Sequence, residues 1–317
     1  MQKILIIRFS AIGDIVLTSP VIRCIKLQMK PKLHFLTKKQ YMSILTSNPY
    51  LDKVIPLQDN LSATCSVLRK ENYDLIIDLQ SNVRSFWLKL NLFKQSVTVK
   101  KENWKKFLYI NFGVNKLGGH VVDRYFKTVQ NLGIINDFNG LDYFIGSKIN
   151  IDFDISQNFI AWSVGGSYLQ KQLSKQQIVE VSNSILTPIV LLGGPNEKKF
   201  GDSIVVSSKN KKIFNFCGQL SLDESAYLIE RSRLVLSNDT GLMHIAAAFK
   251  KEIVSFWGCT KPSLGFSPYM ANEKSVQIVF KPLSRPCSKH GQFCKKTSKG
   301  CVKKISSKEI IETILNS

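Results

Sequence analysis

A stretch of small and polar residues after an apolar segment has the composition of an anion-binding turn. Leu234–Leu236 predicts a short strand, and Thr240 and Gly241 open an alanine-rich segment that predicts a helix. The first turn of a helix leaves backbone N–H groups unpaired and carries partial positive charge, so a phosphate is stabilised there. The sequence therefore predicts a phosphate site around Asp239, Thr240 and Gly241, with His244 one turn later on the same face. The alternative is that Asp239 or Thr240 only caps the helix and that His244 is a packing residue.

A second carboxylate, Asp14, follows a glycine at the first predicted strand-to-helix turn. Ile4–Ile7 predicts the strand, and spaced apolar residues between positions 15 and 27 predict the helix. The turn lacks the G-x-G-x-x-G pattern of dinucleotide folds, which argues against a nicotinamide-dependent enzyme. A carboxylate here can act as a general base or as a plain helix N-cap, and the residues alone leave both interpretations open.

Cysteines near the end of the chain raise the question of a metal. Cys287, Cys294 and Cys301 form C-x6-C-x6-C with His290 inside. Structural zinc sites usually bring ligands as close C-x2-4-C pairs, so this spacing favours reduced thiols in a lysine-rich loop over a metal site. The D-x-D sequence Asp152–Asp154 lies in an expected linker, and we do not interpret it as a metal site either. No metal is therefore expected.

The overall composition is basic. The chain has 317 residues with 44 Lys and Arg against 23 Asp and Glu, a formal charge of +21. Such a field favours anionic partners, which are nucleic acid, an anionic membrane surface or phosphorylated substrates. Neither a signal peptide nor an apolar run of membrane-spanning length is recognised, and seven cysteines without a disulfide framework suit a reducing compartment. We therefore expect a cytosolic protein, with a basic aromatic segment at 100–107 that is either an ordinary amphipathic surface or a binding site for lipid or single-stranded nucleic acid.

Apolar segments of strand length alternate with helix-length segments along the chain. The predicted strands are 4–7, 33–36, 53–57, 75–79, 159–164, 189–192, 212–217, 234–236 and 253–256. This rhythm is typical of α/β folds with doubly wound parallel sheets, whose ligands bind at the carboxyl ends of the strands. We predict an N-terminal domain at 1–150, a C-terminal domain at 151–305, and a helix within 306–317 that packs back across the domains.

Several segments together carry a family resemblance. They are FSAIGDIVLTSPVIRCIK near the start, VLLGGPNE, FCGQLSLDESAYLIERSRLVLSNDTGLMHIAAAF, and FWGCTKPSLGFSPY. The sequence resembles the bacterial ADP-heptose:lipopolysaccharide heptosyltransferase family, glycosyltransferase family 9. This resemblance implies a GT-B fold, with two Rossmann-like domains facing a central cleft, the acceptor mainly on the first and the nucleotide sugar mainly on the second.

The resemblance also implies roles for individual residues. Asp14 matches the general base, and Lys171 and Asp239 complete the implied catalytic set. The implied donor-binding residues are those of the second domain that match phosphate, ribose, adenine and sugar contacts: Ser167, Lys171, Glu197, Leu220, Asp239, Thr240, Gly241 and His244.

The function implied is an inverting, metal-independent transfer of a heptose or similar sugar from an ADP-sugar to a lipopolysaccharide core or related glycolipid. The implied partners are a nucleotide-sugar donor, expected to be ADP-heptose, and an anionic glycolipid acceptor of the lipid A and core type. The implied location is the cytoplasm, peripheral at the inner face of the cytoplasmic membrane, without a nucleic-acid partner. The alternative is a non-catalytic nucleotide- or nucleic-acid-binding protein on the same scaffold.

Overall fold

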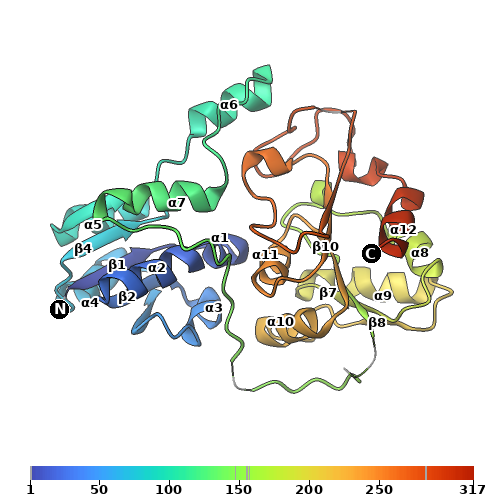
Figure 1. The fold of residues 1–317 in the computed structure, drawn as a ribbon, viewed down its shortest axis with the longest axis horizontal. Helices are drawn as coiled ribbons and strands as arrows, with labels where there is room; N and C mark the ends of the chain where they lie inside the picture. Colours follow the sequence, from blue (N-terminus) through green and yellow to red (C-terminus); the bar gives the residue numbers. More distant parts are fainter. Residues whose placement is uncertain (1, 147, 155, 157, 283) are drawn as a thin grey trace. The chain divides into compact units, whose positions relative to one another are not determined.

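The computed structural model describes residues 2–146, 148–154, 156, 158–282 and 284–317. The chain forms two compact units, each with its own parallel sheet (Figure 1). The first unit comprises residues 1–102 and 118–146, and the second comprises residues 103–117 and 147–317.

The first unit is built on a five-stranded sheet in the order β3-β2-β1-β4-β5. Its strands are β1 (Lys3–Ile7), β2 (Lys32–Lys38), β3 (Lys53–Leu57), β4 (Leu75–Asp78) and β5 (Gln95–Thr98), and each neighbouring pair is parallel. Its helices are α1 (Ile12–Val16), α2 (Ser19–Met29), α3 (Ser43–Thr46), α4 (Leu61–Lys70), α5 (Val83–Leu92) and α7 (Val121–Val129), with 3-10 turns η1 (Lys39–Tyr41) and η2 (Gln130–Leu132).

Alternation along the strands gives this sheet two apolar faces. Leu5 and Ile7 point into a core shared with Leu68 of α4 and Leu88 of α5. Since successive strand residues point to opposite faces, Ile4 and Ile6 face the other side of the sheet, and they are fully buried as well. A sheet covered on both faces is what near-continuous apolar strands require.

The second unit has a six-stranded sheet in the order β11-β10-β9-β6-β7-β8. Its strands are β6 (Ile160–Ser163), β7 (Ile189–Leu192), β8 (Ile213–Asn215), β9 (Leu234–Asn238), β10 (Ile253–Trp257) and β11 (Val276–Val279), again parallel throughout the pairs. Its helices are α6 (Asn103–Phe112), α8 (Lys175–Asn183), α9 (Lys198–Ser207), α10 (Leu222–Arg231), α11 (Gly241–Ala248) and α12 (Ser307–Leu315). Its 3-10 turns are η3 (Leu169–Lys171), η4 (Pro195–Glu197), η5 (Pro262–Leu264) and η6 (Cys301–Lys304).

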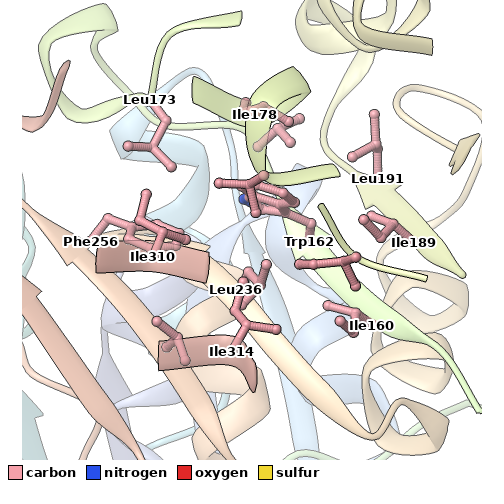
Figure 2. Close-up of a cluster of buried hydrophobic side chains, with 14 of the residues drawn as sticks. Ile160, Trp162, Leu173, Ile178, Ile189, Leu191, Leu236, Phe256, Ile310 and Ile314 are labelled. Atoms are coloured by element: carbon pink, nitrogen blue, oxygen red, sulfur yellow. The ribbon is translucent and has the colours of Figure 1, made fainter. Parts of the chain in front are cut away.

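Every second residue of the central strands enters one core of this unit (Figure 2). Trp162, Leu236 and Phe256 gather there with Ile178 of α8 and with α12, which contributes Ile310 and Ile314. The C-terminal helix therefore packs on α8 of the same unit. Its start is also tied to α8, because the Ser307 hydroxyl donates to Glu180 Oε2 at 2.6 Å.

The predicted elements agree closely with the observed ones in the buried centre of each sheet. Helix α10 begins with a capping box, since Ser221 N donates to Glu224 Oε2 and Glu224 N donates to Ser221 Oγ. In α12, Ser306 occupies the N-cap position but makes no side-chain capping hydrogen bond.

Candidate active site

The second unit contains a topological switch point between two adjacent strands. Strand β6 lies between β7, to which the chain runs next, and β9, which pairs with the opposite edge of β6. Because the strands are parallel, the loops after β6, β7, β9 and β10 emerge at one edge of the sheet. Ligands of doubly wound sheets bind at such an edge, next to the switch point.

An ion pair joins the loops that follow β6 and β9. Lys171 Nζ lies 2.7 Å from Asp239 Oδ2, and the two side chains are only 11% and 13% exposed. Thr260, in the loop after β10, donates its hydroxyl to the same Asp239 oxygen at 3.0 Å. Three strand ends are thereby tied together, and the predicted residues Lys171 and Asp239 are in direct contact.

Helix α11 begins just after Asp239. Thr240 is the N-cap of α11 and is extended, with Gly241 as the first helical residue. The Thr240 side chain makes no capping hydrogen bond; its hydroxyl lies 3.2 Å from Ser163 Oγ and 3.3 Å from Ser237 Oγ. The simple-cap interpretation therefore does not describe Thr240. The helix start keeps N–H donors that an anion can use.

A buried asparagine, Asn238, which was not predicted as a site residue, ties the end of β9 to the loop after β6. Asn238 is fully buried, and its Nδ2 donates to the Val164 carbonyl at 3.2 Å and the Gly165 carbonyl at 2.9 Å. The loop after β6 is thus clamped to the end of β9. A polar residue closing an otherwise apolar strand was the available signal for Asn238. The signal for Thr260 was weaker, because a threonine in a loop is common.

Glu197 lies in the loop after β7 and faces the loop after β6. Its Oε2 accepts from the Gly194 N–H at 2.9 Å. Two glycines make room for it, because a Cβ at Gly193 would lie 2.9 Å from Glu197 Cβ and one at Gly165 would lie 3.3 Å from Glu197 Cδ. The Glu197 carboxylate is therefore held at the same sheet edge as Lys171.

The remaining predicted donor residues are placed less tightly. Ser167 is exposed in the loop after β6, and Leu220 is partly buried in the loop after β8. Among the described residues, the Ser167 hydroxyl makes no hydrogen bond to the other predicted site residues. His244, within α11, is 3% exposed.

In the first unit, Asp14 occupies the third position of α1 rather than its N-cap. Arg8 Nη2 lies 2.7 Å from Asp14 Oδ2, and Arg8 also donates to the carbonyls of Ser10 and Leu79, each at 2.8 Å. Burial disfavours the Arg8 charge, but Tyr125 and Asp14 outweigh it and raise the Arg8 pKa above its ordinary value. The Asp14 side chain remains 29% exposed, so Arg8 fixes a carboxylate that solvent or substrate can reach.

The polar residues at the end of β4 and in the loop after it hydrogen-bond to one another and to the backbone. Asp78 is fully buried, lies 3.0 Å from Lys89 Nζ, and accepts from the N–H groups of Gln80 and Ser81. Gln80 Oε1 in turn accepts from the Phe9 N–H at 2.8 Å. These bonds shape the loop beside Asp14.

A candidate metal-binding group lies inside the second unit, next to the loop after β10. Cys259, Cys287, Cys294 and Cys301 bring their sulfur atoms within 4.8 Å of one another. The last three form the C-x6-C-x6-C sequence that encloses His290. The fourth member of the group in the structure is Cys259, which follows β10 and Gly258. Asp154, from the D-x-D sequence, accepts from Ser156 N and Oγ instead.

The described residues include no helix long and apolar enough to cross a membrane.

Known proteins resemble this chain along most of its length. Residues 62–297 match glycosyltransferase family 9 (heptosyltransferase). The chain is 24% identical over 290 residues to lipopolysaccharide heptosyltransferase 1 of Campylobacter coli, covering 82% of this chain and 84% of that protein.

Solved structures share the fold. The glycosyl transferase family 9 protein from Veillonella parvula has a TM-score of 0.80 at 18% identity, covering 100% of this chain and 98% of its own. Escherichia coli heptosyltransferase WaaC, solved with ADP, has a TM-score of 0.73 at 19% identity, covering 99% of both chains.

Two parallel-sheet domains of this kind constitute the GT-B fold, which confirms the predicted fold class. With the family match spanning most of its residues, the chain belongs to glycosyltransferase family 9, the heptosyltransferase family, and is a glycosyltransferase.

Proposed function

We propose that this enzyme transfers a heptose from ADP-heptose to the core of lipopolysaccharide or a related glycolipid, with inversion at the anomeric carbon. The observation that carries the proposal is the Lys171–Asp239 pair at the start of α11, on the switch-point edge of the second sheet. The names of the relatives supply the donor and acceptor classes, since they are heptosyltransferases of lipopolysaccharide and one was solved with ADP.

The donor diphosphate is assigned to the loop after β6 and the start of α11. Lys171 supplies a positive charge, the first-turn N–H groups of α11 supply fixed donors, and Ser167 and Thr240 supply hydroxyls. Charge grows on the departing ADP in the transition state, and preorganised donors of this kind stabilise it where it develops. These groups are proposed to do so without a metal ion.

The nucleoside is assigned to the neighbouring loops. Glu197 accepts hydrogen bonds from the ribose hydroxyls, and Leu220 provides an apolar contact for adenine. Asp239 has two tasks in this proposal: it orients Lys171 and accepts a hydrogen bond from a hydroxyl of the sugar. His244, one turn into α11, completes the sugar and diphosphate surroundings.

Asp14 is assigned as the general base. The acceptor hydroxyl must lose its proton as it attacks the anomeric carbon from the side opposite the leaving ADP, which inverts the configuration. Arg8 Nη2, 2.7 Å from Asp14 Oδ2, fixes the carboxylate so that it orients the acceptor hydroxyl as well as taking its proton.

The acceptor class implies contact with a membrane surface, and α6 is the element suited to make it. Trp104, Phe107 and Phe112 are 69%, 46% and 66% exposed, and the Trp104 and Phe107 rings stack at 5.4 Å. Exposed aromatic rings on a helix bind at the boundary between lipid headgroups and acyl chains, and the net charge of +21 favours anionic headgroups. We therefore place the enzyme in the cytoplasm, peripheral at the inner face of the membrane.

A ligand screen followed by one substitution tests the function. In a thermal-shift assay at low and physiological salt, ADP and ADP-heptose should stabilise the protein, whereas UDP, GDP and a short RNA should not. A ligand at one hundred times its dissociation constant stabilises the folded state by about 2.7 kcal/mol. Asp14→Ala should then lower transfer by about 10²–10⁴-fold with ADP binding unchanged.

Two results would contradict the proposal. Stabilisation by RNA alone, lost at physiological salt, would favour the non-catalytic nucleic-acid-binding alternative. Full turnover by Asp14→Ala would remove Asp14 from the mechanism. For the membrane contact, Trp104→Ala should reduce co-sedimentation with anionic vesicles, and equal binding to neutral vesicles would contradict an electrostatic contribution.

A further inference from the structure

Four cysteines from distant parts of the sequence meet in the interior of the second unit. Cys259 follows β10, Cys287 and Cys294 lie in the loop after β11, and Cys301 begins η6. Cys259, Cys287 and Cys301 are fully buried, and Cys294 is partly buried. The Cys287 sulfur lies 3.9 Å from that of Cys294 and 3.8 Å from that of Cys301, and the last two sulfurs are 3.1 Å apart.

Two of these three separations are those of a mononuclear metal site, and the third, between Cys294 and Cys301, is shorter. A zinc ion bound by four thiolates at about 2.3 Å in a tetrahedron separates the sulfurs by about 3.8 Å. Two of the observed sulfur–sulfur distances have this value, and all four sulfurs fall within 4.8 Å. A cluster of several iron atoms would not fit between sulfurs so close together. Tetrahedral all-sulfur sites select zinc or iron among the common metals.

Backbone N–H groups point at the sulfurs of the cluster. The N–H groups of Lys296 and Thr297 donate to Cys294 Sγ at 3.4 and 3.3 Å, and the Cys301 N–H donates to Cys259 Sγ at 3.4 Å. Such donors stabilise a thiolate more than a neutral thiol, as a metal ligand requires.

The loop that carries Cys287 and Cys294 has no regular secondary structure of its own. The described residues between 281 and 300 form no helix or strand. The apolar cluster under the loop consists of the cysteines themselves with Phe280 packed against them. Small segments that cannot build a core are commonly held by a structural metal.

We propose that Cys259, Cys287, Cys294 and Cys301 form a mononuclear tetrathiolate centre for a zinc or iron ion. The centre is structural: four protein ligands complete a tetrahedron and leave no position for a reacting group. In metal binding each thiol loses its proton to solvent and each sulfur donates an electron pair to the ion, with no change in oxidation state.

The loop fixed by this centre packs on the loop that carries Lys171. A Cβ at Gly291 would lie 2.5 Å from Lys171 Cγ, and one at Gly300 would lie 2.7 Å from Gln170 Cα, so both contacts are close. Gln292 Nε2 also donates to the Tyr168 hydroxyl at 3.1 Å. On the other side, Cys259 directly precedes Thr260, which donates to Asp239. The ion therefore positions Lys171 and Asp239, an effect on donor binding that rests on the proposed function.

Metal analysis of the full chain tests the centre directly. The protein, purified without an affinity tag under reducing conditions, should contain one zinc or iron per chain by elemental analysis. A colourless protein identifies zinc, and visible sulfur-to-iron charge-transfer bands identify iron. Cys294→Ser should lower the metal content about tenfold or more, because a ligand is lost. Cys294→His should retain the metal, because imidazole can replace a thiolate in such sites.

Cys65→Ser is the matched control, since Cys65 is also a buried thiol, 2% exposed, but lies outside the cluster. It should keep one metal per chain. Metal-free wild-type protein that takes up neither zinc nor iron under reducing conditions would overturn the proposal. So would a Cys294–Cys301 disulfide, seen as five instead of seven titratable thiols after denaturation with a chelator.

The coupling to the donor site has a separate readout. Cys294→Ser should weaken ADP binding about tenfold, in the range seen when groups supporting a metal site are lost, while Cys65→Ser should not. A wild-type protein that binds the metal but not ADP would refute the proposed function and leave the centre intact. Full ADP affinity in metal-free Cys294→Ser would refute the positioning role.

Discussion

Lys171 offers the sharpest test of the donor site, and Lys171→Met is the substitution of choice. Methionine removes the ammonium group but keeps an unbranched stem, so the close packing of Gly291 on Lys171 Cγ and Cδ is preserved. A hydrogen bond to a charged group contributes about 1.5–3 kcal/mol. Its loss alone should weaken ADP binding about 10- to 150-fold.

The structure adds a second contribution, from Asp239. With Lys171 gone, the carboxylate that lay 2.7 Å from its ammonium keeps only the Thr260 hydroxyl as the partner described above. A carboxylate about 5 Å from a phosphate charge repels it by about 3 kcal/mol at an effective dielectric constant of about 20, before salt screening. We therefore expect Lys171→Met to weaken ADP binding by about 100-fold or more, and the double variant Lys171→Met/Asp239→Asn by only about tenfold.

Isothermal titration calorimetry with ADP and with adenosine separates phosphate binding from nucleoside binding. Adenosine carries no phosphate, so Lys171→Met should leave its affinity unchanged. Urea unfolding of each variant excludes a global loss of structure. An ADP affinity within twofold of wild type, or an equal loss for adenosine, would refute the assignment of Lys171 to the diphosphate.

Three further predictions concern single positions. The wild-type protein should bind ADP about tenfold more tightly than 2′,3′-dideoxy-ADP, because the dideoxy analogue cannot donate a hydrogen bond to the Glu197 carboxylate. Glu197→Ala should abolish this preference, and an equal preference in both proteins by competition binding would contradict the assignment. The hydrogen bond from Lys3 lowers the pKa of Glu71 to about 2, so its stabilisation is present above about pH 4.3 and is lost as the pH falls toward 2. Glu71→Gln should therefore reduce the free energy of unfolding by about 1–2 kcal/mol at pH 7 and by nearly nothing at pH 2, and a pH-independent difference in urea unfolding would argue against the ion pairs. Gly291→Ala places a Cβ 2.5 Å from Lys171 Cγ at a residue with φ of +78°. ADP titration should therefore show about tenfold weaker binding, and urea unfolding should show a free energy of unfolding lower by about 1 kcal/mol. Wild-type ADP affinity would show that the loop does not position Lys171.

The buried centre of each sheet was predictable because both faces of those strands are covered. Ile189–Leu192, for example, reads as an uninterrupted apolar run and coincides with β7. The edge strands β5 and β11 were missed, whereas the edge strands β3 and β8 were predicted. In β5 (Gln95–Thr98) the residues are exposed or partly exposed, and in β11 (Val276–Val279) Ile278 alone is buried, so neither has the pattern of a covered strand.

The candidate site was predictable where backbone geometry dictates residue type. Gly241 after a strand and before a helix indicates an anion site, and the structure places it beside the Lys171–Asp239 pair. Contacts across the sheet were not predictable, because they depend on which strands are neighbours. Thr260 reaches Asp239, and Asn238 reaches Gly165, through the pairing of β9 with β10 and β6.

The cysteine cluster shows the same limit. The regular spacing of Cys287, Cys294 and Cys301 lacks a close pair, which favoured free thiols. Cys259 joins them because the end of β10 lies beside η6, where a Cβ at Gly258 would come within 2.3 Å of the Val302 nitrogen. Cys259 is distant in sequence from the other three cysteines, so its proximity to them follows from the sheet topology and could not be predicted from spacing.

The most direct test of the central claim is a transfer assay with ADP-heptose and a heptose-free lipopolysaccharide core acceptor. The product is followed by mass spectrometry, and its anomeric configuration is determined by NMR. The proposed function predicts a heptosylated acceptor, one ADP released per transfer, and a linkage of anomeric configuration opposite to that of the donor. Retention of configuration, or release of ADP with free heptose as the sole sugar product, would contradict it.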